Sequence, residues 1–294
     1  MRRIRALLTG GMAALVAVLA VPAGTASAEP PAPAAAPVAS AALATWFSGV
    51  LQPGAMQSNW KWKAGSDAVY EVAFSPSGAT AAAPCQFEST RSWYTQETNG
   101  DRYFRWTVKN VGTIACGADV ILTYRLKTAS FASPGVNAGA TWPKTWTIDP
   151  AKPVYLAGLW TAGATTGAAC SMEVNRIWYE RTFNDVVLHV VVKNIGTVTC
   201  TTTLMLANQA TGGSLMTAMI TTTTPYSTFW KNANPVTSAF WMAVSPDSGF
   251  CALELTRQFY QQRLTDTVLR RDIGITVKNV GSNACSGTVK WAVV

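Results

Sequence analysis

The side chains best suited to chemistry are a glutamate and an arginine that stand three residues apart and occur as a pair three times. The pairs are Glu88 with Arg91, Glu173 with Arg176, and Glu254 with Arg257. An arginine fork binds carboxylates or sugar hydroxyls, and a glutamate accepts hydrogen bonds from hydroxyl groups. Each pair is therefore a candidate ligand-binding clamp. The same repetition also fits a structural ion pair or hydrogen-bond brace, and the sequence leaves both alternatives open.

Few residues suit catalysis. His189 is the only histidine, and its position in the strand has the opposite parity to the core residues Leu188, Val190 and Val192, so we expect it to face outward. No Gly-x-Ser-x-Gly element, paired Cys-x-x-Cys or Asp-rich calcium loop is present. Two carboxylates could still converge for glycoside cleavage, although three of the glutamates are tied to repeated positions. We therefore predict that the protein is not an enzyme and has no cofactor and no metal site.

The Glu-x-x-Arg pairs belong to a longer signature, Cys-x-x-Glu-x-x-Arg-x-x-Tyr followed by Val-Lys-Asn-x-Gly-x-x-x-Cys, that occurs three times and uses every cysteine. Only pairing within each copy keeps the copies equivalent, so the signature predicts three disulfides. These are Cys85–Cys116, Cys170–Cys200 and Cys251–Cys285. Each closes a loop of about 30 residues and stabilises the fold by roughly 3–4 kcal/mol through loop-closure entropy. Paired cysteines are typical of exported proteins.

The spacing of apolar residues predicts strands. Phe104, Trp106 and Val108 alternate with polar residues, which is typical of a half-buried strand, and the Asn-x-Gly that follows predicts a turn. The other two copies repeat this pattern. We therefore predict an all-β protein of three tandem, disulfide-stapled β-sandwich domains. The expected domain boundaries are 45–128, 129–211 and 212–294.

Parity along the first signature strand indicates which side chains face the core. Cys85, Phe87 and Trp93 share one parity and are expected to be buried, whereas Glu88 and Tyr94 fall on the other face. Arg91 has the core parity, which is unexpected for a charge. It must therefore reach the edge of the sandwich or pair with a carboxylate, unless a bulge resets the parity.

The chain contains 12 tryptophans. Trp60, Trp146 and Trp230 occupy matching places in the three copies and are expected in the core. The tryptophans that do not recur are candidates for stacking on a sugar ring or inserting at a membrane interface. The candidates are Trp46, Trp62, Trp142, Trp160, Trp241 and Trp291.

The N-terminal residues predict export. Basic Arg2, Arg3 and Arg5 precede an apolar stretch and a small-residue cleavage site, so residues 1–28 are expected to be a signal peptide. The Pro/Ala-rich segment 29–44 is expected to be a linker. We predict a secreted, extracellular protein with no membrane span. The formal charge of +8, or +5 without the three signal arginines, favours weak attraction to anionic polysaccharides, although simple solubility explains it as well. No Lys/Arg cluster indicates nucleic-acid binding.

The string Val-Lys-Asn-Val-Gly-Thr at 108–113 resembles the VxVxNxG element of immunoglobulin-like adhesion modules of the CARDB type found in bacterial secreted proteins. The resemblance implies a seven-stranded sandwich that serves as a binding or spacer module, and it carries over no catalytic residue. We predict a secreted non-enzymatic protein that recognises carbohydrate, such as a polysaccharide or cell-surface glycan, or another cell-surface component. The alternative is a structural or protein-interaction subunit, a spacer or adhesin, of an extracellular assembly. Specificity is expected where the three copies disagree.

Overall fold

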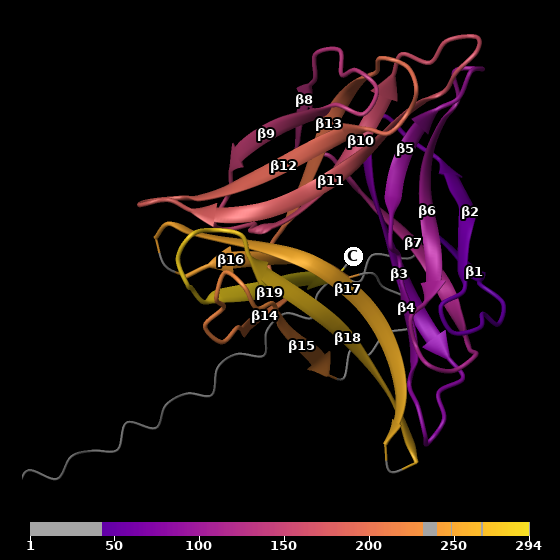
Figure 1. The fold of residues 1–294 in the computed structure, drawn as a ribbon, viewed down its shortest axis with the longest axis vertical. Coiled ribbons are helices and arrows are strands. Elements are labelled where there is room, and N and C mark those ends of the chain that lie inside the picture. Colours follow the sequence, from indigo (N-terminus) through magenta and orange to yellow (C-terminus); the bar gives the residue numbers. More distant parts are fainter. Residues whose placement is uncertain (1–42, 232–239, 248, 266, 294) are drawn as a thin grey trace, which may run out of the picture. The chain divides into compact units, whose positions relative to one another are not determined.

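The computed structural model describes residues 43–231, 240–247, 249–265 and 267–293. The predicted signal peptide and nearly all of the predicted linker lie outside these ranges. Within them the chain forms strands and no helix, which confirms the predicted all-β class (Figure 1). No helix in the described part is long and apolar enough to cross a membrane.

The strands follow the same order in each of the three repeats. Repeat 1 contains β1 (Ala44–Phe47), β2 (Met56–Lys63), β3 (Ala68–Ser77), β4 (Cys85–Glu88), β5 (Ser92–Gln96), β6 (Arg102–Asn110) and β7 (Gly117–Leu126). Repeat 2 contains β8 (Ala129–Ala132), β9 (Thr141–Thr147), β10 (Val154–Ala162), β11 (Cys170–Arg181), β12 (Val186–Asn194) and β13 (Thr201–Gln209). Repeat 3 contains β14 (Gly213–Met216), β15 (Tyr226–Lys231), β16 (Phe240–Pro246), β17 (Cys251–Thr265), β18 (Val268–Asn279) and β19 (Gly287–Val293).

Each repeat contributes to two layers of sheet. One layer is a separate three-stranded sheet, in the orders β1-β7-β3, β10-β13-β8 and β14-β19-β16. The remaining strands of all three repeats form a single ten-stranded sheet. Apolar side chains of both layers fill one continuous core, with Trp106, Leu204 and Val289 among its buried members. This sandwich-like arrangement follows from strands whose apolar residues alternate with polar ones.

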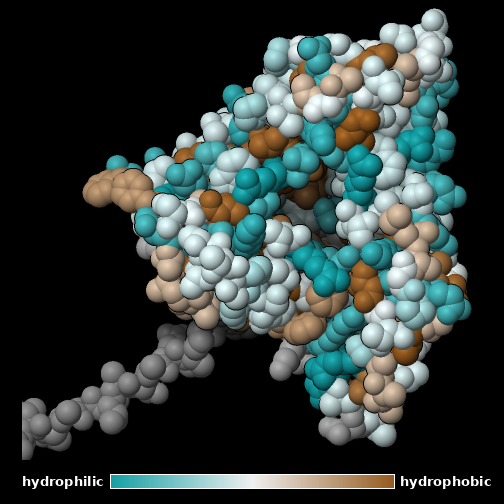
Figure 2. Space-filling model, in the orientation of Figure 1, coloured by the Kyte–Doolittle hydropathy of each residue, from teal (hydrophilic) through white to brown (hydrophobic). Residues whose placement is uncertain are grey.

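The signature strands join the three repeats into a closed ring. In repeat 1 the signature strand is divided into β4 and β5, and its counterparts are the continuous strands β11 and β17. β5 pairs with the start of β11, the end of β11 pairs with the start of β17, and the far half of β17 returns to β4 (Figure 1). Each signature strand thus gives its neighbour a hydrogen-bonding partner, so the three repeats form one compact unit. The space-filling view shows a hollow near the middle of the face that it presents (Figure 2).

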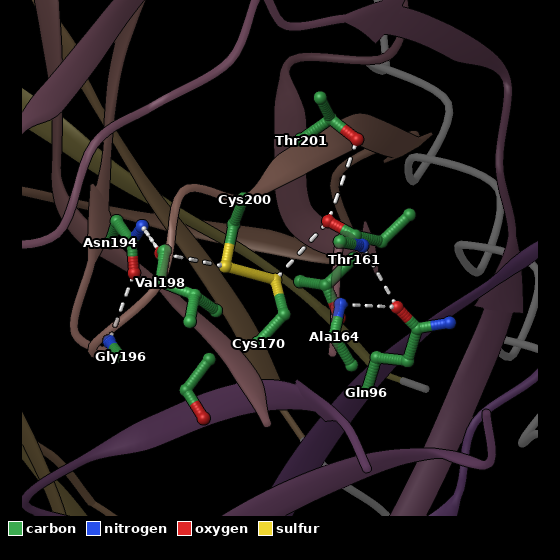
Figure 3. The surroundings of a disulfide bond; sticks show 12 residues. Gln96, Thr161, Ala164, Cys170, Asn194, Gly196, Val198, Cys200 and Thr201 are labelled. Atoms are coloured by element: carbon green, nitrogen blue, oxygen red, sulfur yellow. Dashed lines mark hydrogen bonds between the residues drawn. A yellow bond between two sulfur atoms is a disulfide. The ribbon is translucent and has the colours of Figure 1, made fainter. Parts of the chain in front are cut away.

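The three predicted disulfides are present with the predicted pairing. In repeat 1, Cys85 lies in β4 of the large sheet, and Cys116 immediately precedes β7 of the small sheet. The bond therefore ties the two layers together. Figure 3 shows the equivalent bond of repeat 2, between Cys170 and Cys200, next to a contact with repeat 1. There the side-chain oxygen of Gln96 accepts hydrogen bonds from the backbone of Gly163 and Ala164 at 2.9 and 3.0 Å.

The asparagine of the Val-Lys-Asn-x-Gly element is a buried brace for the turn. Asn194 is 0% exposed, and its Nδ2 donates to the carbonyl oxygens of Val136 and Val198 at 2.7 and 2.8 Å. The backbone nitrogen of Gly196 donates to its Oδ1 at 2.9 Å. Asn110 and Asn279 make the same three bonds in their repeats. Glycine suits this turn because a Cβ at position 196 would lie 3.1 Å from the backbone nitrogen of Ser171, which is closer than ordinary van der Waals contact.

Bulges reset the parity of the signature strands, as one of the sequence-based alternatives allowed. The register shifts between Val174 and Arg176 and again between Leu255 and Arg257, and in repeat 1 the strand is interrupted at 89–91. The arginine consequently points outward. In repeat 1 the expected burial of Trp93 and the expected outward direction of Tyr94 were wrong, because the irregularity exchanges the two faces of the strand. Trp93 and Trp178 are half-buried, and Tyr94 is 4% exposed.

We expect substitution of Asn194 by alanine to lower the free energy of unfolding by about 3 kcal/mol, because it leaves two carbonyls and one N–H without partners. Asn110→Ala and Asn279→Ala should behave similarly. Urea denaturation with the disulfides intact measures the change. Asn184→Ala, at an exposed position in the same repeat, is the control and should change stability little. Equal stabilities of Asn194→Ala and Asn184→Ala would contradict the role given to the brace.

Candidate functional sites

The six Glu and Arg residues of the signature form ion pairs between repeats and not within them. The Nε of Arg91 donates to the carboxylate of Glu173 at 2.7 Å, Arg176 donates to Glu254 at 2.9 Å, and Arg257 donates to Glu88 at 2.6 Å. The arginine of each repeat therefore pairs with the glutamate of the next repeat, and the arginine of repeat 3 pairs with the glutamate of repeat 1. Nothing in the three-residue spacing predicted this exchange.

Each arginine also lies against the aromatic ring two residues further along its strand. The guanidinium carbon is 5.4 Å from the ring centre of Trp93, 4.7 Å from that of Trp178 and 4.7 Å from that of Phe259. The glutamate side chains are only 12–15% exposed, whereas those of the arginines are 39–48% exposed. The bonds to the neighbouring repeat give these residues a structural role in closing the ring. A role in ligand binding for them stays a prediction.

The tyrosine that completes the first half of the signature lies inside the ring. Tyr94, Tyr179 and Tyr260 are at most 7% exposed, and burial raises the pKa of each phenol. Tyr260 accepts a hydrogen bond at 2.8 Å from Gln258. The three phenols therefore stay neutral at physiological pH and belong to the packing of the ring.

Three neighbouring cavities meet at the centre of the ring, and each is lined by residues of at least two repeats. Cavity A, of about 370 Å³, lies beside the Glu88–Arg257 pair. Cavity B, of about 340 Å³, lies beside the Arg176–Glu254 pair, and cavity C, of about 180 Å³, is lined mainly by repeats 2 and 3. Glu71 and Leu255 line all three.

Glu71 is the residue that sequence reasoning missed. It lies in β3, where its cross-strand partner is Thr123, and the equivalent positions in β10 and β16 carry Leu156 and Trp241. A signal was present in the sequence, because Glu71 is the one acidic residue in the otherwise apolar run from Ala68 to Phe74.

Burial raises the pKa of Glu71 from 4.5 to about 8, opposed by a hydrogen bond from the backbone of Val72. Within the described residues Glu71 makes no ion pair. Its charged neighbours in cavities A and B are the Glu88–Arg257 and Arg176–Glu254 pairs, which are already neutralised. Tyr94 and Tyr260 are also close enough to interact with it electrostatically.

A second site is a groove of about 540 Å³ in repeat 1 that is rich in tryptophan. Its lining residues are Trp46, Phe47, Ser48, Gln57, Asn59, Trp60, Lys61, Trp62 and Trp106. The ring of Trp46 lies 6.0 Å from that of Trp60, 5.7 Å from that of Trp62 and 6.1 Å from that of Trp106. Trp106 is fully buried, whereas the other three rings are partly exposed.

A register shift in β2 builds this groove. Between Gln57 and Trp60 the strand gains one residue relative to β6, so that Trp60 lies opposite Trp106, and Trp62 lies opposite Phe104. Trp146 and Trp230 lie opposite the counterparts of Phe104, which are Leu188 and Ile273. Trp62 therefore occupies the shared position and Trp60 is the additional tryptophan, which reverses the assignment made from chain spacing.

The other predicted tryptophans lie apart from the groove. Trp160 packs between repeats 1 and 2, with the guanidinium of Arg102 4.4 Å from its ring centre. Trp142 is half-buried in β9, opposite Val192. Trp241 is only 1% exposed and lines cavity C, so it offers no face on the outer surface.

His189 is half-buried and does not stand alone. Its ring stacks on Trp178 at 4.6 Å, and its Nε2 lies 2.9 Å from the carboxylate of Glu180. Within the described residues no group of three or more His, Cys, Asp or Glu side chains could hold a metal ion.

Comparison of the chain with known protein families, curated proteins and solved structures finds no match.

The ion pairs between repeats should stabilise the ring. A double-mutant cycle of Arg176→Ala and Glu254→Ala is expected to give a coupling free energy of about 1 kcal/mol, reduced by the partial exposure of the arginine. The control is the exposed Lys127–Asp67 pair, 2.6 Å apart, whose coupling should stay below about 0.5 kcal/mol. Chemical denaturation measures both cycles. A coupling for Arg176 and Glu254 no larger than that of the control would count against a structural role.

Glu71 should make stability depend on pH. Its pKa is higher in the folded than in the unfolded chain, so the folded state holds the proton more tightly. The free energy of unfolding should fall as pH rises between about 4.5 and 8, by up to about 1.4 kcal/mol per pH unit, and then level off. Glu71 is only partly buried, so the slope should be below this limit.

The Glu71→Gln variant isolates this effect, because it keeps the shape of the side chain and removes the titration. Its stability relative to the unmodified protein should rise across the same pH window in urea denaturation. Glu97→Gln, which alters a glutamate paired with Arg105 outside the cavities, serves as the control. A constant difference between Glu71→Gln and the unmodified protein from pH 5 to 8 would refute the assignment.

Proposed function

We propose that the protein is a secreted, non-enzymatic carbohydrate-binding protein and that the tryptophan groove of repeat 1 is its binding site. The observation that carries the proposal is the cluster of Trp46, Trp60 and Trp62, whose rings are partly exposed along one groove. The three disulfides and the predicted signal peptide support an extracellular location.

The groove combines the two kinds of contact that a sugar needs. Indole rings offer large, flat apolar faces that suit the C–H face of a pyranose, and they lose little conformational entropy on binding. Exposed Asn59 and Lys61 at the border supply polar groups for hydroxyls. Apolar walls with a few polar groups are typical of small-molecule sites.

Internal hydrogen bonds hold the groove ready for a ligand. The indole nitrogen of Trp60 donates to Gln57 at 2.9 Å, and the amide of Gln57 donates to the backbone oxygen of Ser48 at 3.0 Å. These bonds fix the ring of Trp60 against the segment that carries Trp46. A prearranged ring binds with less loss of side-chain freedom than a mobile one.

Repeats 2 and 3 lack the elements of this groove. The positions of Trp46 and Trp106 are occupied by Phe131 and Val190 in repeat 2, and by Leu215 and Ile275 in repeat 3. Neither β9 nor β15 has the register shift of β2. The proposal therefore places one strong site in repeat 1 rather than three weak equivalent sites.

Replacing Trp62 with alanine should weaken polysaccharide binding at least tenfold, because it removes a stacking platform at the groove. The matched control is Trp142→Ala in repeat 2. Trp142 is also half-buried but does not line the groove, so this variant should bind normally. A glycan array first identifies a bound sugar, and titration of intrinsic fluorescence then gives the affinity of each variant.

The same pair of variants separates the competing ideas. Equal losses in Trp62→Ala and Trp142→Ala would indicate sites distributed over the repeats and would refute a single groove. Failure to bind any glycan or cell-wall polysaccharide would refute carbohydrate recognition and favour the structural or protein-interaction alternative.

A further inference from the structure

Cavity C is lined by side chains that have no part in the proposed carbohydrate binding. Its walls carry four aromatic side chains from repeats 2 and 3, which are Tyr155, Tyr179, Phe240 and Trp241. Of the described residues that line it, Glu71 of repeat 1 is the one acidic or basic side chain that titrates near neutral pH. The space of about 180 Å³ admits a small organic group. Glu71 and Leu255 line it and also line cavities A and B.

Among the described residues, Glu71 has no cation beside it in cavity C. No arginine or lysine of that part of the chain lines the cavity, and the arginines beside cavities A and B are bound to Glu88 and Glu254. A carboxylate without an ion-pair partner in a largely apolar setting is costly when ionised, and a cation that enters the cavity offsets that cost.

Aromatic rings around a carboxylate favour one class of cation. Ring faces attract alkylammonium groups through their electron-rich π systems, and cages of Trp, Tyr and Phe recognise quaternary ammonium in this way. A metal ion is a poorer match, because hard cations need several oxygen ligands and Glu71 is the only carboxylate among the described residues that line cavity C.

We propose that cavity C binds a small organic ammonium ion, with Glu71 as the counter-charge and Trp241, Tyr179 and Phe240 as the aromatic wall. The cation enters by way of cavities A and B, whose linings include the exposed residues Thr256, Thr90 and Asn175. Repeats 2 and 3 have Leu156 and Trp241 where repeat 1 has Glu71, so the ring holds one such site.

The probe is choline, and its neutral isostere 3,3-dimethyl-1-butanol is the control ligand. Isothermal titration calorimetry of the full chain should show binding of choline and at least tenfold weaker binding of the isostere. Glu71→Gln should lower choline affinity at least tenfold, and Glu97→Gln, outside the cavity, should not change it. Because the carboxyl holds a proton in the empty cavity near neutral pH, choline binding at pH 7 should release up to one proton, measured in buffers of different ionisation enthalpy.

Glu71→Leu, which copies the residue of repeat 2, is a second variant if Glu71→Gln folds poorly; thermal melting checks both. Equal affinities for choline and the isostere would show a merely apolar cavity and overturn the proposal. So would undiminished choline binding by both folded variants, or no binding of choline, trimethylammonium or tetramethylammonium to the unmodified protein. Because the tryptophan groove is a separate site, Trp62→Ala should bind choline normally whether or not the groove binds sugar.

Discussion

The structure depends on the hydrogen bonds that each signature strand makes with the signature strand of the next repeat. A strand with an open edge exposes a row of N–H and C=O groups that must find partners. Here β5, β11, β17 and β4 satisfy one another in turn, and the last pairing joins residues of repeat 3 to residues of repeat 1. The ring closes because the third repeat returns to the first. The cavities exist because the strands approach one another at their ends and leave the middle of the ring incompletely filled.

The bulge in these strands lets each of them place an aromatic side chain in the core and a charged side chain at the contact with the next repeat. Without it, the arginine would share the parity of the buried cysteine and the tyrosine would face outward. The shift at Arg176 and Arg257 turns the guanidinium toward the neighbouring glutamate and turns the tyrosine into the interior. One local irregularity, repeated with the sequence, therefore gives both the ion pairs between repeats and the aromatic lining of the centre.

The features that could be predicted from sequence are those determined within one repeat. The disulfides follow from equivalence of the copies, and the Asn-x-Gly turn follows from the conformational freedom of its residues. The pairing between repeats could not be predicted, because the pattern of β11 is the same whether its edge meets solvent or β17. Glu88 and Arg91 looked like one clamp because they are close in the chain, but each binds a residue more than eighty positions away. Trp60 and Trp62 were exchanged because counting along the chain does not detect the extra residue by which β2 shifts its register against β6. The expectation that specificity lies where the copies disagree stays a prediction; Glu71, Trp46 and Trp106 do differ from their counterparts.

The covalent linkage of three similar repeats into one ring relaxes a constraint that symmetry imposes on assemblies of identical subunits. In a trimer of identical chains, every substitution near the symmetry axis appears three times. A glutamate at position 71 would then bring three carboxylates together in an apolar space, where their mutual repulsion would add to the desolvation of each. In a single chain the second and third positions remain leucine and tryptophan, so the centre of the ring can carry one acidic group. Fusion of the repeats thereby permits a chemically asymmetric interior inside a nearly symmetric framework.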